Sequence, residues 1–136
     1  MTDTPKDLIA PDLAAFEAMA MAARDALPEV YANAARALAI RVEDFAPEAM
    51  LRDTEIDNAF ELTGLYDGIP LTEKSVMDQP MGPDTIWLFR RPILDEWADR
   101  GNVTLQALVS HVLVHELAHH FGWSDDDVAA IDPWWE

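Results

Sequence analysis

The sequence predicts a compact α+β domain with N-terminal helices, a small mixed β-sheet and a long helix near its C-terminal end. Apolar residues recur at helical spacing over residues 12–26, and the stretches 38–45 and 85–89 are rich in β-forming residues. Residues 104–121 form a long apolar run between a threonine and a glycine. The 136 residues fit a single domain whose core is large enough to fold without disulfides. We expect residues 1–10 to be frayed.

The N-terminal third is predicted to form two helices and a strand. The first helix begins at Asp12, which can act as its N-cap, and runs to Ala26. Pro28 interrupts the apolar pattern, so a second, shorter helix is expected over residues 29–38. Residues 38–45 then alternate between apolar and polar side chains, as in a strand with one polar face.

Glycine and proline punctuate the middle of the chain. Residues 46–63 match no clear pattern, and residues 64–70 (GLYDGIP) are predicted to be a loop with a short strand beside it. Residues 73–84 contain two prolines and a glycine and are expected to be a connection. Residues 85–89 (TIWLF) are predicted to be a strand, either at an edge of the sheet, where a peptide can pair with it, or in the core. A helix is expected over residues 92–99.

A long helix is predicted next, with Thr104 as its cap and Phe121 near its end. Gly122 is expected to stop this helix, since glycine is common just past a helix C-terminus. Ser124 or Asp125 is predicted to cap a short final helix.

Composition restricts the functional classes. The chain has 26 acidic and 9 basic residues, a net charge of −17, and no Lys or Arg after Arg100. Such a surface repels phosphate backbones and anionic lipids, so we expect no nucleic-acid partner and no membrane partner. It either attracts metal cations and basic peptides or serves only to keep the protein in solution. There is no cysteine, so a metal must be held by His, Asp or Glu. No apolar run approaches the roughly 20 residues of a membrane span, and the first residues do not resemble a signal peptide. A cytoplasmic protein is expected.

All four histidines lie in the stretch HVLVHELAHHFGWSDDD, which contains the motif HExxH. On a helix, His115 and His119 lie about 40° apart and one turn from each other, so both imidazoles can reach one metal ion. Glu116 stands at the rim of the same face, where it can hold a metal-activated water without being a ligand. This arrangement predicts a catalytic Zn²⁺ site.

A catalytic zinc usually needs a third protein ligand and an open position for water. Gly122 follows His119 by three residues and allows the chain to turn back, and Asp125 follows after three more. The full pattern, HExxHxxGxxD, is far rarer by chance than HExxH alone. Asp125 is the predicted third ligand, with Asp126 as the alternative.

The two remaining histidines are not expected to bind the metal. His111 lies one turn before His115, too far along the axis for one ion to meet His111, His115 and His119 together. It is predicted to pack in the core or to support a ligand. His120 points about 120° away from the middle of the metal face and is predicted to pack.

The segment HELAHHFGWSDDD, together with LTGLYDGIPLT and PDTIWLFRRPI, resembles the minimal zincin-like metallopeptidase family of bacteria. The resemblance covers the chain from about Phe16 to Ile131 and is most specific at the zinc motif. It implies a small α+β zincin fold.

By position, the resemblance implies that His115, His119 and Asp125 are zinc ligands and that Glu116 is the catalytic base. Such sequences commonly read Asp-Asp-Glu where this chain reads Ser124, Asp125 and Asp126. The departure retains the ligand aspartate and affects only the local helix cap.

The expected function is therefore peptide-bond hydrolysis by metal-activated water, with Glu116 as general base and a peptide or protein as substrate. Tyr66 is our choice for the catalytic side chain that stabilises the oxyanion, among four candidates: Tyr31, Tyr66, Arg90 and Arg91. One alternative is a metal-binding module with a regulatory or assembly role and no peptidase activity. Another is hydrolysis of a non-peptide substrate at the same site. Trp134 and Trp135 are predicted either to line a pocket or contact, or to pack against the domain.

Overall fold

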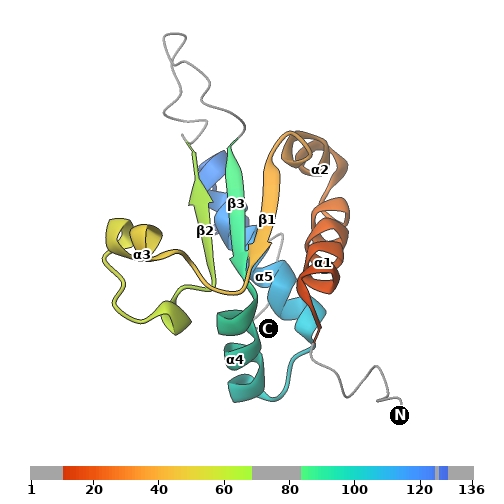
Figure 1. The fold of residues 1–136 in the computed structure, drawn as a ribbon. Helices are drawn as coiled ribbons and strands as arrows, with labels where there is room; N and C mark the ends of the chain where they lie inside the picture. Colours follow the sequence, from red (N-terminus) through yellow and green to blue (C-terminus); the bar gives the residue numbers. More distant parts are fainter. Residues whose placement is uncertain (1–10, 69–83, 125, 129–136) are drawn as a thin grey trace.

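The computed structural model describes residues 11–68, 84–124 and 126–128 (Figure 1). The chain contains several helices and three strands that form one sheet. The predicted α+β class is therefore confirmed. The elements, in chain order, are α1 (Leu13–Asp25), α2 (Glu29–Ala35), β1 (Ala39–Glu43), α3 (Glu48–Thr54), the 3₁₀ helix η2 (Ala59–Glu61), β2 (Gly64–Asp67), β3 (Thr85–Phe89), α4 (Arg90–Arg100) and α5 (Leu105–Phe121).

Local signals set the N-terminal elements. The Asp12 carboxylate accepts a hydrogen bond from the Ala15 N–H at 2.9 Å and caps α1, as predicted. Helix α2 begins directly after Pro28 and ends at Ala35, earlier than expected. Strand β1 lies within the predicted stretch 38–45.

The sheet has the strand order β1–β3–β2. β1 pairs with β3 in parallel, with Ala39 opposite Thr85, and β2 pairs with β3 antiparallel, with Tyr66 opposite Ile86. Gly64–Asp67 is therefore itself a strand, and the prediction that the whole segment 64–70 is a loop is wrong for these four residues.

The suggestion that TIWLF is an edge strand is also wrong, since β3 lies between the other two strands. Its residues Ile86, Leu88 and Phe89 have no exposed surface. A continuous apolar run is typical of a strand that is buried on both faces, which is the position β3 occupies. β2, shorter and less apolar, lies at an edge of the sheet that the described residues form.

The main core lies between the sheet and two helices. Ile86 and Leu88 of β3 pack in one cluster with Phe16 of α1 and Leu113 of α5. α1 lies against α5 and β1, and α5 also contacts β2 and β3; in Figure 1, α5 passes behind the strands. The opposite face of β3 packs in a smaller cluster, which joins Phe89 to Ala46 and Leu62.

Within the part of the chain that the structure describes, no helix has both the length and the apolar character that a bilayer span requires.

Candidate metal centre and active site

Helix α5 carries the HExxH motif and ends where the sequence predicts. The Thr104 hydroxyl accepts a hydrogen bond from the Ala107 N–H at 3.1 Å and caps the helix. Gly122 terminates it with φ 72°, a left-handed conformation that favours glycine. The N–H groups of Gly122 and Trp123 both donate to the Ala118 carbonyl, so the chain turns away immediately after the motif.

The two predicted imidazole ligands lie on one exposed side of α5. His115 and His119 are exposed, one helical turn apart, whereas Leu117 between them is buried in the core. Two accessible imidazoles on one helical face suit a divalent transition metal. Among the described residues, no set of three His, Asp or Glu side chains converges as a metal site. Of the three predicted ligands, His115 and His119 lie within the described residues.

The predicted third ligand, Asp125, lies outside the described residues. Its neighbours form a reciprocal cap: the Ser124 hydroxyl accepts from the Asp127 N–H at 3.2 Å, and the Asp127 carboxylate accepts from the Ser124 N–H at 3.0 Å. Ser124 is therefore the cap of the final helical segment, one of the two predicted candidates. The alternative ligand Asp126 is exposed.

Glu116 is half-buried, between α5 and the edge strand β2. A Cβ atom added to Gly64 would lie 3.4 Å from Glu116 Cγ, so the strand backbone passes close to the side-chain stem. Burial raises the pKa of Glu116, while His119 and the backbone of Tyr66 act in the opposite direction. A carboxylate with a raised pKa is better matched to proton transfer near neutral pH.

The Tyr66 hydroxyl, our predicted oxyanion donor, lies in a polar cluster. It is 2.6 Å from Oδ2 of Asp84 and 3.0 Å from Nδ1 of His120, and Nδ1 of His120 is 3.3 Å from the same Asp84 oxygen. We call these three residues the Tyr66 cluster. The side chains of His120 and Asp84 are only 8% and 14% exposed, so the cluster is largely shielded from water.

The sequence did not predict this cluster. His120 is buried, as expected for a packing residue, but it also makes polar contacts. Tyr66, Asp84 and His120 are far apart in the chain, and no spacing rule relates them. The available signal was strand alternation, because Asp84 lies two residues before buried Ile86 and so faces the same side of the sheet.

His111 supports the predicted ligand face. It is half-buried, and its ring meets the His115 ring edge-to-face with a centroid separation of 4.3 Å. This contact places His111 where it can orient the His115 imidazole.

The other oxyanion candidates have contacts elsewhere. Tyr31 packs edge-on against Trp123 with ring centroids 4.9 Å apart. Arg90 pairs with Asp44 at 2.6 Å, and the Arg91 guanidinium lies 5.6 Å from the centroid of the Phe45 ring. The predicted pocket or packing residues Trp134 and Trp135 lie outside the described residues.

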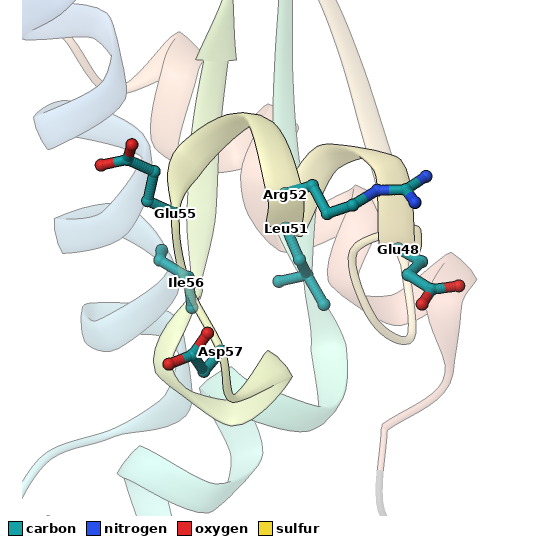
Figure 2. A pocket seen from close by; sticks show the side chains of 6 residues that line it. All are labelled: Glu48, Leu51, Arg52, Glu55, Ile56 and Asp57. Atoms are coloured by element: carbon teal, nitrogen blue, oxygen red, sulfur yellow. The ribbon is translucent and has the colours of Figure 1, made fainter.

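A separate cavity of about 360 Å³ is formed by α3 and the turn that follows it (Figure 2). Its lining contains three carboxylates and one guanidinium, and none of the motif residues: Glu48, Leu51, Arg52, Glu55, Ile56 and Asp57. This cavity is therefore distinct from the candidate active site, which is the surface between α5 and β2.

Comparison with known families gives a match to a model described as a zincin-like metallopeptidase, over residues 35–135. This range includes the whole sheet, α4, α5 and the complete HExxHxxGxxD pattern. A search of curated proteins finds no matching relative.

Proposed function

From the premise that the chain belongs to the zincin-like metallopeptidase family, we propose that it is a zinc-dependent peptidase with Glu116 as its general base. The observation that carries this proposal is the placement of Glu116. Its half-buried carboxylate lies on the same helix as two exposed imidazoles and faces the edge strand β2. A structural zinc site needs four ligands and no neighbouring base, so Glu116 favours a catalytic site.

His115, His119 and Asp125 would hold the zinc ion, with Asp126 as the alternative to Asp125. When bound, zinc acts as a Lewis acid that makes water more acidic and polarises a carbonyl group. Glu116 accepts the proton of the attacking water and then delivers it to the leaving amine nitrogen. Burial raises the pKa of Glu116, which suits its carboxylate to both proton transfers.

The proposed substrate is a peptide in extended conformation. β2 lies at the sheet edge next to α5, so a peptide that adds to this edge would run beside Glu116. The acidic surface favours basic peptides. We retain Tyr66 as the proposed oxyanion donor, a role that requires its hydroxyl to leave Asp84 and His120.

The decisive experiment compares wild-type protein with Glu116→Gln on an unbiased peptide library, after the zinc content of both is measured. We expect equal zinc content and a loss of cleavage of about 10²–10⁴-fold in the variant. Glu43→Gln, an exposed change at the other edge of the sheet, is the matched control and should retain full cleavage.

Equal cleavage by wild type and Glu116→Gln would contradict the assignment of the base. Zinc binding without cleavage of any peptide would favour the metal-binding module, or hydrolysis of a non-peptide substrate.

A further inference from the structure

Three aromatic rings meet where α5 ends and the chain turns away from the metal motif. Phe121 is the last residue of α5, Trp123 follows Gly122, and Tyr31 comes from α2. The Trp123 and Phe121 rings stack with centroids 4.9 Å apart, and the Tyr31 ring lies 4.9 Å from Trp123, edge-on, and 5.8 Å from Phe121. We call Tyr31, Phe121 and Trp123 the Trp123 cluster. Aromatic rings at such separations and angles attract one another beyond the effect of the area they bury.

Tyr31 brings to this cluster a helix that is itself held by the core. The N–H groups of Tyr31 and Ala32 both donate to the Pro28 carbonyl at 2.9 Å, in the first turn of α2. Ala32 and Ala35 are buried in the main core, and Tyr31 packs against the same core. α2 therefore supports the Tyr31 ring from a part of the chain that is far from α5 in sequence.

Trp123 is held by its backbone as well as by its ring. Its N–H donates to the Ala118 carbonyl at 3.0 Å, which closes the end of α5 across the left-handed Gly122. Its half-buried indole packs against the main core. Trp123 lies between His119 and the aspartates at 125–126, so the Trp123 cluster acts on the short connection from the second predicted ligand to the third.

The chain is anchored again directly after these aspartates. Val128 is only 5% exposed and belongs to the main core. Its N–H donates to the Ser124 carbonyl at 3.0 Å, and Ser124 and Asp127 cap one another. The connection therefore has one anchor before the two candidate third ligands, at Trp123, and one after them, at Val128.

We propose that Tyr31 and Val128 are positioning residues for the third metal ligand, because they anchor the chain on both sides of Asp125 and Asp126. A ligand on an anchored chain loses less conformational entropy when an ion binds, so removal of either anchor should weaken metal binding. The role of these carboxylates as candidate ligands rests on the proposed function. The anchoring does not, since its contacts join described residues only.

Amide hydrogen exchange in metal-free, full-length protein tests the anchoring by itself. Tyr31→Leu removes the ring and keeps an apolar side chain. We expect it to speed exchange of the Trp123 and Val128 amides by about 2–10-fold, the range that the loss of one aromatic pair allows. Tyr31→Phe keeps the ring through which these contacts are made, so it should exchange like wild type.

A matched control removes an aromatic ring of the same geometry elsewhere in the molecule. Phe60 meets Phe45 edge-on with centroids 5.0 Å apart and an interplanar angle of 82°, against 4.9 Å and 79° for Tyr31 and Trp123. Phe60 lies in η2, outside the Trp123 cluster and outside α5. Phe60→Leu should therefore leave the Trp123 and Val128 amides at their wild-type exchange rates.

Zinc affinity, measured by competition with a chelating dye, tests the consequence for the metal. We expect Tyr31→Leu and Val128→Ala to bind zinc about 10-fold more weakly than wild type, the lower end of the range for changes just outside a ligand shell. Tyr31→Phe and Phe60→Leu should match wild type. This readout requires no substrate and no cleavage.

A double-mutant cycle determines whether the anchors act through the third ligand. In a background that lacks both candidates, Asp125→Ala with Asp126→Ala, Tyr31→Leu should cause no further loss of zinc affinity. An equal loss in both backgrounds would place its effect elsewhere and overturn the proposal. Wild-type exchange and wild-type zinc affinity in Tyr31→Leu and Val128→Ala would also overturn it, and if one of the two variants fails to fold, the other decides.

Failure of the proposed function gives a different pattern of results. Wild-type protein that binds zinc but cleaves no peptide would refute the peptidase, and the zinc affinities would still decide the positioning role. Wild-type protein that binds no zinc would refute the ligand set and the positioning role together, whatever the exchange rates.

Discussion

The Tyr66 hydroxyl lies 3.0 Å from Nδ1 of His120 and 2.6 Å from Oδ2 of Asp84. One side chain of the edge strand therefore contacts both α5 and the residue that precedes β3. A shift of β2 along the helix would break both contacts at once. Because Gly64 of the same strand closely approaches Glu116, the position of the proposed base depends on the packing of the sheet edge.

Zinc content should distinguish the histidines of α5. We expect His115→Ala and His119→Ala to lose bound zinc, because each removes an imidazole from the proposed set of three protein ligands. His111→Ala should retain zinc, since His111 contacts the His115 ring from the neighbouring turn. Metal analysis after dialysis at neutral pH measures the difference. Loss of zinc from His111→Ala equal to that from His115→Ala would place His111 among the ligands.

The third ligand can be identified by single substitutions after the glycine. Asp125→Ala should lower zinc affinity severely, whereas Asp126→Ala should leave it near the wild-type value. Asp127→Ala serves as a structural control, because Asp127 caps the following helical segment through Ser124. Competition with a chelating dye gives the three affinities. The reverse order for Asp125 and Asp126 would assign the role to Asp126.

Gly64→Ala should destabilise the fold and displace β2 from α5. The new Cβ would lie 2.7 Å from Val112 Cγ1 and 3.1 Å from the Trp87 carbonyl oxygen, so the strand must move. Overpacking of this kind costs about 1–3 kcal/mol. Urea unfolding measures the cost, and Gly101→Ala, with open space around the added Cβ but a positive φ, gauges the separate effect of backbone strain. A stability equal to wild type would show that β2 is not held as closely as described.

The junction of α1 and α2 should respond to acid. Arg24, followed by Arg36, holds the pKa of Asp25 below its ordinary value of 3.8. A lowered folded-state pKa stabilises the protein above the unfolded-state value, and this stabilisation is lost as pH falls through the folded-state pKa. Asp25→Asn should therefore be less stable than wild type at pH 7 and equal to it in strong acid. Urea midpoints across pH measure the trend, with exposed Asp99→Asn as control; a difference that persists in strong acid would contradict the ion-pair cause.

Local signals explain why α5 could be predicted nearly to the residue. Thr104 and Gly122 act on the helix ends through bonds to residues within five positions, and a helical spacing places His115 and His119 on one face by geometry alone. The capping role of Ser124 is similarly local. These features need no knowledge of the rest of the fold.

Features that depend on tertiary contacts were not predictable in the same way. The burial of β3 on both faces depends on the segments that cover it, so its apolar run was compatible with an edge or a central strand. The partners of Tyr66 lie 18 and 54 residues away, at Asp84 and His120. His120 was correctly expected to be buried, but its polar role follows only from where β2 lies.

The parallel pairing of β1 with β3 also affects the order in which the protein folds during synthesis. Ala39 faces Thr85 across a chain separation of 85 − 39 = 46 residues, so the central pairing is non-local and its loop-closure entropy opposes early formation. α5, which covers Ile86 and Leu88, follows all three strands in chain order. During synthesis from the N-terminus, the sheet therefore lacks α5, the later of its two covering helices, until the histidines themselves have emerged. The proposed metal ligands on α5 thus reach the sheet last, so their site forms together with the final layer of the core and not before it.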